Sequence, residues 1–193
     1  MCKKDSSLFE DAVRFATDAH EGMVRKVGNT PYILHPMEVA AIAATMTDDV
    51  DVLAAALLHD VVEDTDHSLH EIECRFGQRV ASLVASETEN KRHDVSPSES
   101  WRIRKEESLA DLEHSDRSAK IVWLSDKLAN MRSFYRQYLV QGSALWARFN
   151  QSDPVQQAWY YTSVARLCAE LAQEAAWQEY DRLVRIVFED ELA

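Results

Sequence analysis

The chain has 193 residues and a formal net charge of −12 at pH 7, with 46% hydrophobic and 28% charged residues. This length supports one domain with a proper core, and the composition is that of an ordinary globular protein. The excess of acidic residues disfavours nucleic acid and anionic membranes as main partners.

Apolar residues recur at helical spacing along most of the chain, which predicts its elements in order. These are a helix over about 8–20, an ordered loop over 21–35, a helix opened by Pro36, a helix over about 50–63, a short helix ending at Phe76-Gly77, and helices over about 78–89, 99–113 and 116–139. A weakly patterned linker over 141–153 follows, and from Pro154 the chain is helical nearly to its end, with a break near 175–178.

Only four glycines and four prolines are present, and no stretch alternates as a strand does. We therefore expect an all-α fold in a single domain over residues 1–193, with a core over about 8–140 and C-terminal helices over about 154–193. The three cysteines are scattered, which argues against a disulfide framework or a thiolate zinc site. The sequence has no apolar signal stretch and no run of membrane-spanning length, so we expect a cytoplasmic protein.

The dipeptide His59-Asp60 lies inside an apolar run that ought to be buried. Buried charge needs a partner, and no Lys or Arg occurs between Lys26 and Arg75. With His35 upstream and Asp126 downstream, the chain supplies two imidazoles and two carboxylates that could bind one divalent metal. Taken singly, each residue has a plainer explanation, such as a hydrogen-bonded turn histidine or a solvated carboxylate.

Two further carboxylates, Glu63 and Asp64, follow His59 and Asp60 at a spacing of four, which places all four on one wide helix face. Carboxylates one turn from a metal site suggest hydrolysis by an activated water. The segment 91–105 carries five basic residues, Lys91, Arg92, Arg102, Arg104 and Lys105, against two acidic ones. A clamp for a small polyanion and a solvated helix face explain this basic strip about equally well.

A series of motifs in order resembles the HD-domain phosphohydrolases, and among them the hydrolase domain of RelA/SpoT homologues, especially the free-standing small alarmone hydrolases. The matching motifs are Phe15-Ala-x-x-x-His20, Arg25-Lys26-x-Gly28-x-x-Pro31-Tyr32-x-x-His35-Pro36, Ala56-Leu-Leu-His59-Asp60-x-Val-Glu63-Asp64-Thr65, Ile72-x-x-x-Phe76-Gly77 and Leu124-x-Asp126-Lys-Leu-x-Asn130-Met131-Arg132. The resemblance covers about residues 8–170. It implies an HD-domain helical bundle.

The resemblance also implies roles for individual residues. One divalent metal, usually manganese, would be held by His35, His59, Asp60 and Asp126. Glu63 and Asp64 would position and deprotonate the attacking water. Substrate contacts would come from Arg25, Lys26, Tyr32, Asn130, Arg132 and, less securely aligned, Tyr160 or Tyr161.

The resulting hypothesis is a metal-dependent pyrophosphohydrolase that removes the 3′-diphosphate from (p)ppGpp-type alarmones to give GDP or GTP and pyrophosphate. The alternatives are an HD-family nucleotidase or phosphohydrolase acting on a 5′-monophosphate, ppApp or NADPH, and a non-catalytic nucleotide sensor. A sensor usually lacks a metal ligand or base, whereas every one of them is present here. The expected partner is a small nucleotide, and the sequence leaves homo-oligomerisation open.

Overall fold

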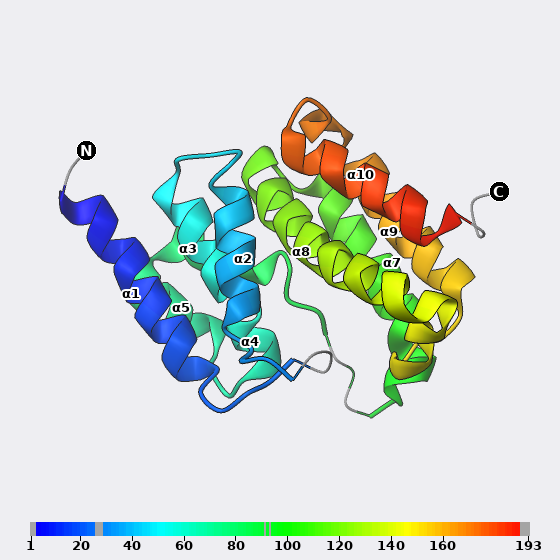
Figure 1. Cartoon of the computed structure of the whole chain (residues 1–193). Helices are drawn as coiled ribbons and strands as arrows, with labels where there is room; N and C mark the ends of the chain where they lie inside the picture. Colours follow the sequence, from blue (N-terminus) through cyan, green and yellow to red (C-terminus); the bar gives the residue numbers. More distant parts are fainter. Residues whose placement is uncertain (1–2, 26–28, 91, 93, 190–193) are drawn as a thin grey trace.

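The fold is all-α, as the sequence predicts. The computed structural model describes residues 3–25, 29–90, 92 and 94–189, and among these no strand occurs. An isolated antiparallel bridge joins Val24 and Pro31. The elements are, in chain order, α1 (Lys3–Ala19), α2 (Leu34–Ala43), α3 (Val50–Leu58), α4 (Val61–Asp64), α5 (Leu69–Phe76), α6 (Gln78–Ala85), α7 (Pro97–His114), α8 (Arg117–Gln141), the 3₁₀ helix η1 (Gly142–Arg148), α9 (Pro154–Leu167), the 3₁₀ helix η2 (Ala169–Leu171) and α10 (Ala175–Val187) (Figure 1).

Helix α8 is the central element. It packs against α2 and α3 on one side and α10 on the other, and Figure 1 shows it running between α2 and α10. Every residue from Ile121 to Ala129 is buried. A helix that is buried all round belongs in the core, so the polar members of this stretch, Ser125, Asp126 and Lys127, must find partners inside the protein.

The predicted single helix over 50–63 is two helices in the structure. Helix α3 ends at Leu58 and α4 begins at Val61, with a turn at His59 and Asp60. At this point the Ala56 carbonyl oxygen accepts a hydrogen bond from the His59 side chain, at 2.8 Å. The side chain thus binds the carbonyl that a continuous helix would offer to the backbone N–H of residue 60.

The segment after α8 is more ordered than its sequence suggests. The expected linker over 141–153 contains η1, whose Leu145 and Trp146 are buried. Trp146 stacks on Phe188 and meets Phe134 edge-on. The break before the last helix falls over 168–174, and not at 175–178. The single-domain boundary stays a prediction.

Two further bounds bear on the site. Helix α6 ends at Ala85, four residues before its predicted end, so Glu87 and Glu89 lie outside it. No helix in the described part of the chain has the length and apolar character needed to cross a membrane.

Candidate active site

The two histidines and the downstream aspartate of the sequence pattern come together. His35 lies in the first turn of α2, His59 in the turn after α3, and Asp126 in the buried stretch of α8. Their ligand atoms all lie within 4.8 Å of one another. Asp126 Oδ1 is 2.9 Å from His35 Nε2 and 3.6 Å from His59 Nε2. Three elements distant in sequence therefore supply one compact donor set.

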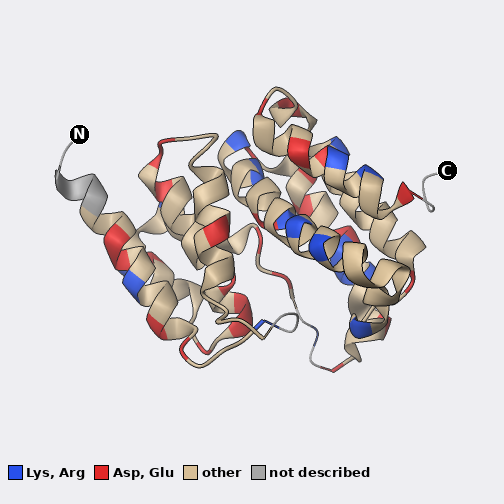
Figure 2. Ribbon diagram, viewed as in Figure 1, with Lys and Arg blue, Asp and Glu red and all other residues tan. Residues whose placement is uncertain are grey.

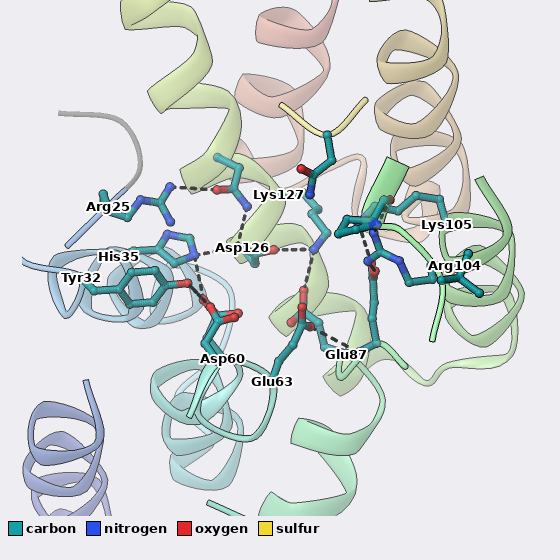
Figure 3. Close-up of a pocket in the computed structure, with 16 residues that line it drawn as sticks. Arg25, Tyr32, His35, Asp60, Glu63, Glu87, Arg104, Lys105, Asp126 and Lys127 are labelled. Atoms are coloured by element: carbon teal, nitrogen blue, oxygen red, sulfur yellow. Dashed lines mark hydrogen bonds and ion pairs between the residues drawn. The ribbon is translucent and has the colours of Figure 1, made fainter. Parts of the chain in front are cut away.

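Asp60 adjoins this group. Its Oδ2 lies 3.2 Å from His59 Nε2 and 3.5 Å from His35 Nε2. The set of two imidazoles and two carboxylates expected from the sequence is thus assembled at one point, and His35, Asp60 and Asp126 line a cavity of about 520 Å³ beside it (Figure 3).

The state of His59 fits a metal ligand. Its Nδ1–H donates to the Ala56 carbonyl oxygen, so Nε2 is the ring nitrogen that can take up a proton or a metal ion beside Asp60 and Asp126. Within the described part of the chain, the buried Nε2 makes no hydrogen bond. A second-shell carbonyl that fixes the imidazole tautomer is the usual arrangement for a metal-binding histidine. The residues present therefore fit a divalent cation.

The electrostatics of the group favour positive charge. Burial opposes protonation of His59, but the carboxylates of Asp60 and Asp126 outweigh it and raise its pKa well above the usual value. Burial likewise opposes ionisation of Asp60, yet the neighbouring imidazoles lower its pKa. Paired carboxylates in a buried site thus call for a proton or a cation, and oxygen with imidazole donors suits first-row divalent metals.

Glu63 and Asp64 both line the same cavity. The Tyr32 hydroxyl lies 2.7 Å from Asp60 Oδ2 and 2.8 Å from Asp64 Oδ2, so its single hydrogen is donated to one carboxylate at a time. Glu63 Oε2 accepts from the backbone N–H of Glu89 at 3.3 Å. The Tyr32 hydroxyl thereby lies within hydrogen-bond distance of both Asp60, a predicted metal ligand, and Asp64, a predicted base.

Arg25 and Asn130 adjoin the donor set through Asp126. Arg25 Nη2 donates to Asn130 Oδ1 at 3.1 Å, and Asn130 Nδ2 donates to Asp126 Oδ1 at 2.8 Å. The Arg25 guanidinium also lies over the Tyr32 ring, 5.7 Å from its centre. Lys26, the neighbouring predicted contact, lies outside the described residues.

Of the remaining predicted substrate contacts, Tyr160 lies beside the site and Arg132 does not. Tyr160 is buried and lines an adjacent cavity of about 430 Å³ together with Tyr161, Trp101, Phe134 and Phe149. Arg132 is not brought to the site.

The guanidinium of Arg132 pairs with both oxygens of Glu179 at 2.7 Å and with Glu38 at 3.3 Å, which joins α8 to α10 and α2. The closeness of Arg132 to Asp126 in the sequence suggested that Arg132 lines the pocket. Six residues along a helix, however, turn the Arg132 side chain well away from the helix face that carries Asp126.

A buried charge network next to Asp126 was not predicted from the sequence. Lys127 Nζ lies 2.5 Å from Asp126 Oδ2 and 3.1 Å from Glu87 Oε1. Lys127 and Glu87 both line the cavity of about 520 Å³. Burial raises the pKa of Glu87 to about 7, against the opposing effect of Lys127. The position of Lys127 inside an apolar run was the available signal, because a buried ammonium needs carboxylate partners.

Part of the basic strip reaches the site. Arg104 and Lys105 on α7 line the cavity and pair with the partly buried Glu89, at 2.7 and 2.5 Å. Arg102 instead stacks over Trp159 and pairs with Glu106, and Arg92 pairs with Glu107. Lys91 lies outside the described residues. Two of the five basic residues are therefore placed to meet an anion.

Comparison with known proteins identifies the family of this chain. The HD domain family model matches residues 12–155. The chain is 40% identical over 135 residues to a Xenopus tropicalis guanosine-3′,5′-bis(diphosphate) 3′-pyrophosphohydrolase, MESH1, covering 68% of this chain and 72% of that protein. The human MESH1 is 44% identical over 130 residues, covering 65% and 69%.

Two solved structures are similar to this chain over most of its length. One, described as a metazoan orthologue of SpoT that hydrolyses ppGpp, superposes with a TM-score of 0.73 at 28% identity, covering 92% of this chain and 94% of that chain. Another, lmo0812 from Listeria monocytogenes, gives a TM-score of 0.70 at 32% identity, covering 80% and 99%. The chain belongs to the HD domain family, and within it to the RelA/SpoT-type hydrolases that its motifs indicate.

Proposed function

We propose that this protein is a metal-dependent pyrophosphohydrolase that removes the 3′-diphosphate from guanosine tetra- or pentaphosphate, giving GDP or GTP and pyrophosphate. The observation that carries the proposal is the buried donor set of His35, His59 and Asp126, next to a cavity that Glu63 and Asp64 line together with His35 and Asp126. The likeness to relatives that carry this activity in their names supports it.

His35, His59, Asp60 and Asp126 would hold the metal. When bound, it would supply Lewis acidity that activates water and offsets phosphate charge. Two imidazoles and two carboxylates suit manganese, iron, cobalt or zinc, and we propose manganese on the family resemblance.

The chain's own residues would then carry out the proton transfer. Glu63 and Asp64 are placed to take a proton from the attacking water, and the Tyr32 hydroxyl orients the Asp64 carboxylate. The water oxygen bonds to phosphorus, and the bond from that phosphorus to the ribose 3′-oxygen breaks. The ribose oxygen takes up a proton, and pyrophosphate leaves with the oxygen from water.

Basic and aromatic groups would hold the nucleotide. Arg25, Arg104 and Lys105 line the cavity and offset phosphate charge. The adjoining cavity, with aromatic walls that include Tyr160 and Tyr161, suits a purine base. The cytoplasmic location and the oligomeric state stay predictions.

The test is the reaction itself. Manganese-loaded protein is incubated with guanosine tetraphosphate, and GDP and pyrophosphate are separated by ion-exchange chromatography. We expect both products in equal amounts and none after chelation. An Asp64→Asn variant should form the products at least about 10²-fold more slowly, whereas Asp66→Asn, which changes an exposed aspartate, should be fully active.

The alternatives give different results in the same experiment. Orthophosphate released from a 5′-monophosphate, with no pyrophosphate from the tetraphosphate, would support a nucleotidase. Tight binding of the tetraphosphate without any product would support a sensor.

A further inference from the structure

Arg25 stands where three cavities meet. It lines the cavity of the metal-ligand cluster, the aromatic cavity, and a third cavity of about 570 Å³. His35 is shared by the first and third cavities, and Ser133 by the second and third. Three spaces of different chemistry therefore open around a single guanidinium group.

The third cavity, which we call the arginine cavity, is lined by Arg25, Thr30, Leu34, His35, Glu38, Ala129, Ser133, Arg136, Gln137, Gln141 and Arg148. Its one carboxylate, Glu38, is already paired with Arg132. Three arginines thus face one acidic side chain whose charge is engaged elsewhere. The cavity is therefore a positive site in a chain that carries a net charge of −12.

Arg136 and Arg148 differ from other arginines nearby. Arg117 and Arg132, which share α8 with Arg136, pair with Glu174 and Glu179. Among the described residues, Arg136 and Arg148 have no carboxylate within ion-pair distance. Figure 2 shows basic segments along α8. Arg136, on α8, and Arg148, on η1, are exposed and line the cavity without a carboxylate partner, so both can meet an anion from outside the chain.

A further lining residue points to a ligand. The side-chain oxygen of Gln137 is buried and, within the described chain, has no hydrogen-bond partner. Such an acceptor is costly unless a donor reaches it, for example a hydroxyl group of a bound molecule. The walls thus combine guanidinium groups for phosphate with an acceptor for a hydroxyl.

The position of the arginine cavity relates it to the reacting centre. Asp126, Ala129, Ser133 and Arg136 succeed one another at spacings of three and four, on one face of α8. Ten residues of helix span about 15 Å, and helical side chains lean toward the N-terminus, so Arg136 leans back toward Asp126. A molecule held at the metal-ligand cluster can therefore extend along α8 into the arginine cavity.

We propose that the arginine cavity binds the second, non-scissile phosphate group of the substrate, the 5′-diphosphate. This inference rests on the proposed function and deepens it. A nucleoside 3′,5′-bis(diphosphate) has three arms around one ribose, and three cavities of matching chemistry meet at Arg25. The scissile diphosphate faces the metal-ligand cluster, the base enters the aromatic cavity, and the other diphosphate lies between Arg136 and Arg148.

Equilibrium binding tests the inference without requiring turnover. The dissociation constants of GDP and guanosine are measured by titration calorimetry on the manganese-loaded full chain, because the two probes differ only in the 5′-diphosphate. We expect GDP to bind at least about tenfold more tightly. Arg136→Ala and Arg148→Ala should each remove most of this difference and leave the constant for guanosine unchanged.

The matched control is Arg166→Ala, which removes an exposed arginine of α9 that lines none of the three cavities. It should preserve the preference for GDP. The inference would be overturned if GDP and guanosine bound with equal affinity, or if GDP bound too weakly to measure. It would also be overturned if the preference for GDP survived both cavity substitutions.

Steady-state kinetics separate this inference from the proposed function. Arg136→Ala should raise the KM of guanosine tetraphosphate about tenfold with little change in kcat, and should not affect guanosine 3′-diphosphate, which lacks the 5′ arm. An equal rise for both substrates overturns the inference while the pyrophosphohydrolase activity stands. Failure to release pyrophosphate from either substrate contradicts the proposed function, and the GDP titration still decides the role of the cavity.

Discussion

His59 is only four residues from Glu63 and five from Asp64, yet these side chains have different surroundings. His59 is buried, and its tautomer is fixed by the Ala56 carbonyl. Glu63 and Asp64 are partly exposed on the cavity wall, where water can reach them. The first environment suits a metal ligand and the second suits a base, so substitutions at these positions should separate metal binding from turnover.

We expect Glu63→Gln and Asp64→Asn to lower kcat by about 10²- to 10⁴-fold, the usual contribution of general acid–base catalysis. Metal content by elemental analysis and helicity by circular dichroism should stay unchanged. His59→Ala should lose the metal as well as the activity. Glu73→Gln, at an exposed position on α5, is the matched control, and full activity of the Glu63 and Asp64 variants would show that these carboxylates only solvate a helix face.

Part of the site was predictable from the sequence because of burial. His59, Asp60 and Asp126 stand out as polar residues inside apolar runs, a pattern that calls for a buried partner. Glu87 gave no such signal, since its role depends on α6 ending early and on Lys127 approaching from α8. A contact between distant elements leaves little trace in local spacing.

At the scale of elements, Arg132 connects α8 to α10 and α2 through Glu179 and Glu38. Its ion pairs are partly exposed, so we expect Arg132→Ala to lower the free energy of unfolding by about 1 kcal/mol and to leave KM nearly unchanged. Urea denaturation and steady-state kinetics measure the two effects, with a Glu179→Ala double-mutant cycle to isolate the pair. A large rise in KM at constant stability would instead support the substrate contact expected from the sequence.

Glu89 joins the segment after α6 to Arg104 and Lys105 on α7. Burial opposes its ionisation, but Lys105 and Arg104 outweigh this and lower its pKa below 4.5. A carboxyl with a lowered folded-state pKa stabilises the protein above its unfolded pKa, and this contribution is lost as the pH falls through the folded value.

We therefore expect Glu89→Gln to lower the free energy of unfolding by about 3 kcal/mol at pH 7, because two cations lose their buried partner. The difference from wild type should shrink as the pH falls below about 4.5. Urea denaturation across pH measures it, with exposed Glu113→Gln of α7 as the control. A difference independent of pH would mean that the Glu89 charge is not what stabilises α7.

The helices themselves follow closely from local signals. Ser68 and Glu71 form a capping box, and α5 ends as predicted at Phe76 before Gly77, whose φ of 89° a glycine adopts without strain. The break at His59, where the side chain bonds the Ala56 carbonyl oxygen, could not be predicted in this way, because it falls inside an otherwise regular helical pattern. Propensity and capping thus locate helix ends such as those of α5, and the exception lies at the site.

At the scale of the whole molecule, the metal-ligand cluster joins α2, the turn after α3, and α8. These elements are separated in sequence, so no preformed site exists in the unfolded chain and metal binding must favour the folded state. Without a cation, the carboxylates of Asp60 and Asp126 rely on the imidazoles and Lys127 for compensation. Metal loading is therefore expected to stabilise the whole fold.

Manganese at a hundred times its dissociation constant should add about 2.7 kcal/mol to the free energy of unfolding. For a chain of this size, this corresponds to a rise in Tm of roughly 5–10 °C, which differential scanning calorimetry measures, and a chelator should reverse it. Asp126→Asn removes one ligand charge at the junction of the three elements and should abolish the rise. Asp66→Asn, which changes an exposed aspartate outside the cluster, should preserve it. A rise in Tm that persists in the Asp126→Asn protein would mean that manganese stabilises the fold from another site, and the cluster of His35, His59, Asp60 and Asp126 would then lose its assignment.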